Sequence, residues 1–251
     1  VIYEDTNLYT YSVGDGAPAY SATKMAAYNR HFLWLKSLPG WSRPVIAVFD
    51  EVVSKSSSFE KTYLLHTEPK PTVSGSLVYA TNGAGMLYQR TVFPRSPSIT
   101  LVGGGGYEYW VDGRNYPPSR GLRPGEEPGS WRVEVSPTTA RTRDEFLHVL
   151  YPTASGTSTP PSVRSIDASA MKGFESQGLV VLFANELGSM SRVVYDLSGS
   201  RTNLLFGLQP AGTYEIRVDG SRVGTEQLSV HGTLDFGNGT SQQLLSLYVP
   251  A

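Results

Sequence analysis

The chain has 251 residues, of which 39% are hydrophobic and 17% are charged, and its formal net charge is -1. This composition is typical of a folded globular protein, and so small a net charge gives no reason to expect nucleic-acid binding through bulk electrostatics. The absence of cysteine excludes disulfides and thiolate metal sites, and no apolar run approaches the roughly 18 residues of a membrane-spanning helix. We therefore expect neither a nucleic-acid partner nor a membrane partner.

The chain is rich in turn-forming and aromatic residues, with 26 Gly, 17 Pro and 15 Tyr, which indicates many short strands joined by tight turns. Residues 7–15 and 28–35 alternate with the period of two that is typical of strands. In the second of these strands one face would carry Tyr28, Arg30, Phe32 and Trp34, and the other face would carry His31. Arg30 and His31 are therefore expected to point in opposite directions.

Residues 43–71 look like the centre of the fold. Val45–Val53 is an almost continuous apolar run interrupted only by Asp50 and Glu51, and Tyr63–Thr67 is a second apolar strand. The polar segment between them is short, so we expect the two strands to form an antiparallel pair. His66 is expected to be a packing histidine in the second strand, and Asp50 a hydrogen-bond acceptor.

Further strands are expected on both sides of a glycine-rich stretch. Residues 77–94 predict a hairpin around the turn Asn82–Gly85, and Gly103–Gly106 predicts a turn, since a strand-like sequence and not a helix follows it. Residues 131–135 alternate cleanly and are expected to pair with residues 146–150.

An aromatic and polar cluster lies between these elements. Aromatic rings stack on the CH groups of sugars, and arginine and asparagine hydrogen-bond to hydroxyl and carboxylate groups. The cluster is therefore either part of the sheet packing or a wall of a substrate cleft; its members are Tyr107, Tyr109, Trp110, Arg114, Asn115 and Tyr116.

The fold class that follows is all-β: a two-layer antiparallel β-sandwich followed by a smaller β-sandwich module. Residues 153–162 contain Ser, Thr, Gly and Pro but almost no apolar side chain, so they are the best candidate for a linker. We therefore place the first domain at residues 1–162 and a small C-terminal β module at residues 163–251.

Three blocks of the sequence resemble the late β-sheet region of the heparinase II/III family of polysaccharide lyases, in the family's order. They are VFDEVVSKSSSFEKTYLLHTEPKP (48–71), GGGGYEYWVDGRNYP (103–117) and GSWRVEVSPTTARTRDEFLHVLYP (129–152). The resemblance covers about residues 20–152 and implies the family's lyase-type supersandwich for that part. It also implies a bacterial protein, periplasmic or secreted, that degrades a glycosaminoglycan or alginate.

The resemblance implies a division of labour within a longer protein. Family members cleave a uronate-containing glycan by β-elimination, with His and Tyr side chains from a helical toroid and the first part of the sheet domain, which also carries a His-x-His zinc site. The four histidines here, at positions 31, 66, 148 and 231, lack that spacing. We therefore expect no catalytic residue, metal site or cofactor in this chain, with zinc confined to the full-length protein.

The expected partners are an anionic polysaccharide and the missing N-terminal toroid segment, and a homo-oligomer is left open. The opening residues, which begin with Val1, do not read as a signal peptide, so we expect a processed product or a fragment. Arg30 could neutralise a uronate carboxylate, so Arg30 and His31 join the aromatic cluster as substrate-binding candidates. The alternative is a carbohydrate-binding or structural, oligomerising β-sandwich without enzymatic activity.

Overall fold

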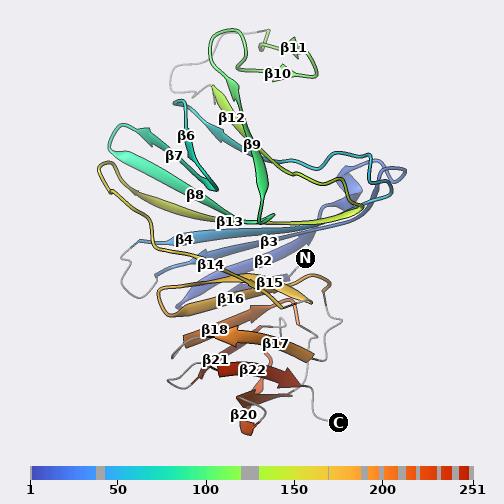
Figure 1. The fold of residues 1–251 in the computed structure, drawn as a ribbon, viewed down its shortest axis with the longest axis vertical. Helices are drawn as coiled ribbons and strands as arrows, with labels where there is room; N and C mark the ends of the chain where they lie inside the picture. The colour runs from blue at the N-terminus through green and yellow to red at the C-terminus, as the bar shows by residue number, and fades with distance from the viewer. Residues whose placement is uncertain are drawn as a thin grey trace.

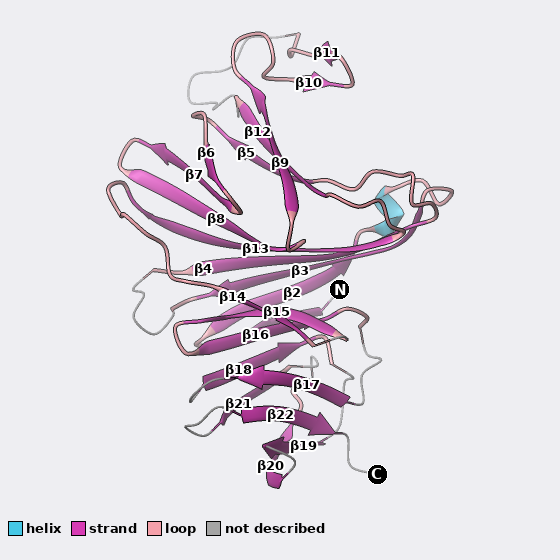
Figure 2. Ribbon diagram, in the orientation of Figure 1, coloured by secondary structure: helices cyan, strands magenta, loops and turns pink. Residues whose placement is uncertain are grey.

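The computed structural model describes residues 2–37, 43–119, 130–168, 170–187, 192–197, 201–208, 213–218, 221–230, 233–238 and 243–248. It consists of β-strands and one short 3-10 helix, η1 (Ala17–Ala19), as Figures 1 and 2 show. The expected all-β class with antiparallel sheets is thereby confirmed. Within these ranges no helix is long and apolar enough to cross a membrane.

The largest sheet, sheet A, has eight antiparallel strands in the order β1-β2-β3-β4-β13-β8-β7-β6. Their bounds are β1 (Ile2–Asp5), β2 (Tyr9–Asp15), β3 (Met25–Leu35), β4 (Val45–Ser54), β6 (Thr72–Ser74), β7 (Leu77–Asn82), β8 (Gly85–Phe93) and β13 (Arg143–Ala154).

A shorter sheet, sheet B, covers part of one face of sheet A. It contains β5 (Tyr63–Thr67), β12 (Trp131–Pro137) and β9 (Pro97–Gly103) in that order. The chain between β9 and β12 carries the small ribbon of β10 (Trp110–Val111) and β11 (Arg114–Asn115), which lies beyond the end of sheet B at the top of Figure 1.

The remaining strands form two further sheets. Sheet C has the order β14-β15-β16-β18-β21, and sheet D has the order β17-β22-β19-β20. The pair β16–β18 is parallel, unlike the antiparallel arrangement expected for this part. Their bounds are β14 (Arg164–Asp167), β15 (Met171–Ser176), β16 (Leu179–Ala184), β17 (Arg192–Leu197), β18 (Arg201–Phe206), β19 (Thr213–Val218), β20 (Ser221–Gln227), β21 (Leu234–Asn238) and β22 (Gln243–Tyr248).

The division into domains at residues 162 and 163 stays a prediction. Among the described strands, no ladder joins one that precedes residue 160 to one that follows it. The apolar core is nevertheless shared across that point, because Phe49 of β4 packs in one cluster with Phe183 of β16 and Phe206 of β18.

The central strands of sheet A are buried on both faces. Residues such as Leu33 and Phe49 face sheet C, whereas Val48 and Phe146 pack with Val133 and other residues of sheet B. A strand buried on both sides reads as a continuous apolar run, which is why β4 lacks the alternation of an exposed strand.

The expected pairing of the strands at 45–53 and 63–67 is wrong. β4 pairs with β3 and β13 in sheet A, whereas β5 pairs with β12 in sheet B. The polar link is therefore a crossing between layers and not a hairpin turn. The expected pairing of 131–135 with 146–150 fails for the same reason, since β12 and β13 belong to different sheets. The hairpin β7–β8 around Asn82 and Gly85 is confirmed.

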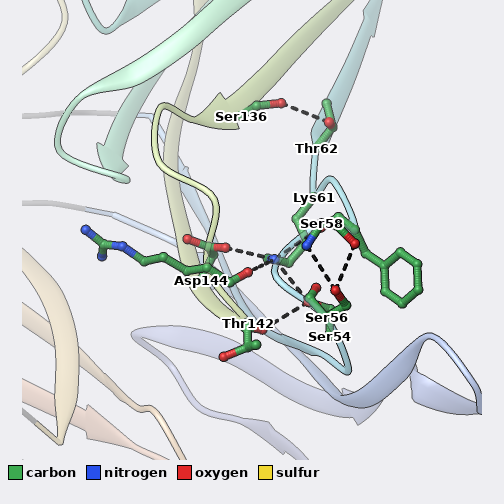
Figure 3. Close-up of polar contacts among 10 residues, drawn as sticks. Ser54, Ser56, Ser58, Lys61, Thr62, Ser136, Thr142 and Asp144 are labelled. Atoms are coloured by element: carbon green, nitrogen blue, oxygen red, sulfur yellow. Dashed lines mark hydrogen bonds and ion pairs between the residues drawn. The ribbon is translucent and has the colours of Figure 1, made fainter.

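A buried ion pair holds the two crossings together (Figure 3). Lys61 Nζ lies 3.0 Å from Asp144 Oδ2, and both side chains are only 6% exposed. The same ammonium donates to the carbonyl oxygen of Arg141 at 2.6 Å and to Ser54 Oγ at 3.2 Å. The Ser54 backbone N–H in turn donates to the carbonyl of Thr142 at 2.7 Å. The segments β4–β5 and β12–β13 are thus fastened to each other where they leave sheet A.

Four connections join sheets A and B, and three of them, β4–β5, β8–β9 and β12–β13, meet sheet A at the same end. The fourth, β5–β6, enters sheet A at the opposite end, because β6 runs in the same direction as β8. β8 is antiparallel to β13, as β4 is, so the ends of β4 and β8 and the start of β13 point the same way. Sheet B rises from this end and diverges from sheet A in Figure 1.

Lys61→Met should lower the free energy of unfolding by about 3–5 kcal/mol, because it leaves the Asp144 carboxylate buried without a cation. Urea unfolding measures this change. The double variant Lys61→Met/Asp144→Leu should recover most of the loss, since it removes both charges.

The matched control is Lys36→Met, which breaks the exposed pair of Lys36 and Asp5 and should lower the free energy of unfolding far less than Lys61→Met does. Equal losses in Lys61→Met and Lys36→Met would contradict a structural role for the buried pair.

Candidate functional site

A cavity of about 550 Å³ opens between the outer face of β3 and β4 and the edge of sheet B. We call it the Arg30 cleft. Its floor is formed by Arg30 and Asp50, which are opposite each other in the β3–β4 ladder. The aromatic side chains in its walls are Tyr20, Tyr28, Tyr63 and Phe146.

Arg30 is held in place by Asp50 through a two-point interaction. Nε lies 2.7 Å from Oδ1 and Nη2 lies 2.6 Å from Oδ2, which is the bidentate geometry that fixes a guanidinium plane. Asp50 is buried, whereas 49% of the Arg30 side chain is exposed. Nη1 has no protein partner in the described part of the chain, so two N–H donors remain for a solute in the cleft.

The floor of the cleft is an ion pair of Arg30 and Asp50, and the tyrosines in its walls are neutral. The hydrogen bonds to Asp50 raise the pKa of Arg30, which stays charged. Burial raises the pKa of Asp50, and hydrogen bonds from Arg30 and Tyr28 oppose that effect. Burial also raises the pKa of Tyr28 and of Tyr63 to about 12, so both phenols are protonated at neutral pH and can donate hydrogen bonds.

His31 does not reach the cleft. It lies on the opposite face of β3, is 1% exposed, and its Nδ1 is 2.8 Å from the hydroxyl of Tyr11. Its ring packs near Phe49 and Phe183 in the core between sheets A and C. The inclusion of His31 among substrate-binding residues is therefore corrected: the alternation that exposes Arg30 buries its neighbour.

The predicted aromatic cluster is brought together, but away from the Arg30 cleft. It lies around β10 and β11, in the lobe beyond sheet B in Figure 2. The Tyr109 N–H donates to Asn115 Oδ1 at 2.9 Å, and the Arg114 guanidinium lies 5.1 Å from the centre of the exposed Tyr116 ring. The other two members, Tyr107 and Trp110, have ring centroids 4.8 Å apart.

The glycine run makes the turn from which this lobe starts. Gly103 has φ of 149° and Gly104 has φ of 81°, both outside the usual range for other residues. A Cβ on Gly103 would lie 2.2 Å from the carbonyl oxygen of Ser130, so the close approach of β9 to the start of β12 requires glycine. The sequence-based interpretation of this run as a turn is confirmed.

The other histidines are also away from the cleft floor. His148 is buried under Tyr63, with ring centroids 3.6 Å apart, and its Nδ1 is 3.2 Å from Thr91 Oγ1. His66 is exposed on β5, so its expected packing role is wrong. His231 lies outside the described residues. In those that are described, no group of three or more His, Asp or Glu is placed to hold a metal ion.

Sequence reasoning did not place Tyr28, Tyr63 and Asp50 in one site. A signal was present at Asp50, since a carboxylate within an apolar strand needs a partner when it is buried. The partner follows only from the β3–β4 register, which puts Arg30 opposite Asp50.

Comparisons with known proteins give a distant structural likeness. No protein-family model and no curated protein matches the chain. Among solved structures, one of a heparinase III with methylated lysines aligns with 95% of this chain, with a TM-score of 0.46 and 8% sequence identity. The chain spans 26% of the length of that structure. The relationship is a distant structural one and assigns no family.

The two buried histidines predict an acid-sensitive fold. Burial lowers the pKa of His31 and of His148 to about 3, from 6.5 in the unfolded chain. Below neutral pH the unfolded state therefore binds protons that the folded state cannot, and stability falls as the pH falls. At about pH 5 each histidine should have removed about 2 kcal/mol from the free energy of unfolding.

Urea unfolding across this pH range tests the expectation. His31→Gln should remove about half of the histidine-dependent loss, whereas His66→Gln, at an exposed position, should leave the pH dependence unchanged. A pH dependence that is the same in all three proteins would contradict this account.

Proposed function

We propose that this chain is the C-terminal β portion of a polysaccharide lyase that acts on a uronate-containing glycan. In this proposal the Arg30 cleft forms one wall of the substrate site, and the groups that transfer protons lie on polypeptide outside the chain. The observation that carries the proposal is the fixed guanidinium of Arg30 in a cleft walled by tyrosines.

The charge of Arg30 is the first feature that supports the proposal. β-elimination from a uronate requires that its carboxylate be neutralised, because this makes the adjacent C5 proton acidic. Arg30 has two unused N–H donors on Nη1 and a plane fixed by Asp50, which is a suitable arrangement for binding a carboxylate. Asp50 thereby acts as a positioning residue, since its buried carboxylate fixes the plane of the Arg30 guanidinium.

The shape of the cleft is the second feature that supports the proposal. The rings of Tyr28, Tyr63 and Phe146 offer apolar faces for the CH groups of a pyranose, and the Tyr63 phenol can donate to its hydroxyl groups. The cleft thus combines the exposed guanidinium of Arg30 with stacking surfaces, which fits an acidic sugar better than a neutral apolar ligand.

The third feature concerns the groups that would transfer protons. No described histidine lines the cleft, and the pKa of both Tyr28 and Tyr63 is raised by burial, which opposes their use as bases. We therefore assign the base and the acid to the toroid-bearing part of the full-length protein, together with any zinc. A bacterial protein that is periplasmic or secreted remains part of the proposal.

A carbohydrate-binding module without enzymatic activity is the second candidate. The lobe around β10 and β11 favours it, because Tyr107 and Tyr116 are exposed there and Arg114 lies over the ring of Tyr116. Such a lobe could bind sugar without any help from the Arg30 cleft. Tyr116→Ala separates the two candidates, since it should affect binding only if the lobe is the site.

Arg30→Gln should weaken binding of hyaluronan or alginate oligosaccharides by about tenfold or more, the usual effect of losing a charged hydrogen bond. Titration calorimetry measures this, and Arg30→Lys should lose less because it keeps the charge. A neutral oligosaccharide such as cellohexaose should not respond to either change. Unaltered binding of the acidic sugars by Arg30→Gln would refute the cleft as their site.

The chain by itself should release no unsaturated uronate product, seen as a rise in ultraviolet absorbance, from heparan sulfate, hyaluronan, chondroitin or alginate. Joining it to the toroid-bearing part should restore turnover. Turnover by the chain alone would overturn the assignment of the proton-transfer groups.

A further inference from the structure

The outer face of β3 continues beyond the Arg30 cleft as an exposed aromatic row. Phe32 and Trp34 follow Arg30 at alternate positions and are 40% and 46% exposed. Alternate residues of a strand lie about 6.6–6.8 Å apart, so the row from Arg30 to Trp34 is about 13 Å long. That length exceeds a single sugar ring.

The composition of this face changes where sheet B stops covering it. Where it is covered, sheet A presents Val48, Phe146 and Leu150, with Ile46 at the margin, all packed against the residues of sheet B. On β3, which pairs with β4, Phe32 lies opposite Val48 and Trp34 lies opposite Ile46. Both aromatic rings nevertheless remain exposed. The uncovered part is thus aromatic, whereas the covered part is mainly aliphatic.

Hydroxyl groups border the aromatic row on its other side. In the β2–β3 ladder, Ser12 lies opposite Phe32 and Thr10 lies opposite Trp34. The hydroxyl of Ser12 has no protein partner among the described residues, so it is available to a ligand. Gly14 lies opposite Arg30 and leaves open space there. Aromatic rings beside hydroxyl groups form a surface on which polyhydroxylated chains can both stack and form hydrogen bonds.

We infer that a linear acidic glycan lies along β3, with one uronate carboxylate on Arg30 and the following sugars stacked on Phe32 and Trp34. This inference rests on the proposed function and deepens it, because it makes the site one for a chain of several sugars and not for a single sugar or a disaccharide. The continuity of the row with the Arg30 cleft, on one face of one strand, is the observation that selects a glycan as the occupant.

The test compares disaccharides and hexasaccharides of hyaluronan and of alginate by titration calorimetry on the full chain. Wild type should bind the hexasaccharide more tightly than the disaccharide. Trp34→Ala and Phe32→Ala should each weaken hexasaccharide binding by about fivefold to tenfold and leave disaccharide binding within about twofold. Val73→Ala, which trims an exposed side chain on β6 at the opposite edge of sheet A, should change neither.

Fluorescence gives a second readout that does not depend on truncating a ring. Binding of the hexasaccharide should change the emission of Trp34, so the change should be lost in Trp34→Phe and kept in Trp110→Phe. Because Trp34 is exposed, Trp34→Phe removes no core contact.

The outcomes separate this inference from the function on which it rests. One outcome is that both sugar lengths bind equally, that Trp34→Ala changes the binding of neither and that Arg30→Gln weakens the binding of both. This outcome refutes the aromatic row and leaves the Arg30 cleft as the binding site. If wild type binds none of the acidic probes, both are refuted. If wild type is a dimer by light scattering and Trp34→Ala is a monomer, a second copy of the chain covers the row and the inference is refuted.

Discussion

The structure depends on the unequal covering of the two faces of sheet A. Sheet C packs along one face, from β2 to β8, whereas sheet B covers the other face only from β4 to β7 and leaves β3 uncovered. β4 and β13 therefore lie in the interior, while β3 has a buried side and a side that meets solvent. The Arg30 cleft is the space beside the edge of sheet B, and it exists because the covering sheet has only three strands.

This arrangement explains how a polar floor forms next to a hydrophobic core. Asp50 projects from β4 toward the covered side, where a free carboxylate would be costly to bury. Arg30, on the neighbouring strand, compensates for that charge from the solvent side and is itself oriented by it. The same pair thus serves packing and, in the proposed function, recognition, and neither role could be performed by one of the two residues alone.

The sequence revealed the strands better than their pairing. Alternation placed Arg30, Phe32 and Trp34 on one face and His31 on the other, and the structure agrees, because side-chain direction in a strand is a local property. Which strands pair with each other is not a local property. The polar segment after β4 has the composition of a hairpin turn, yet it crosses between sheets and is held by Lys61 and Asp144. The aromatic cluster was likewise recognised by composition, but its distance from Arg30 depended on the register and layering that only the fold supplies.

The path of the chain between β9 and β12 has an evolutionary consequence. This segment leaves sheet B and returns to it at the end away from Lys61 and Asp144, and its described strands, β10 and β11, belong to no ladder of sheet A. Insertions or deletions there would leave the register of the scaffold intact, as is usual for exposed loops. Homologous proteins should therefore differ most in length at the β10–β11 lobe, and new specificities could arise there without refolding the rest.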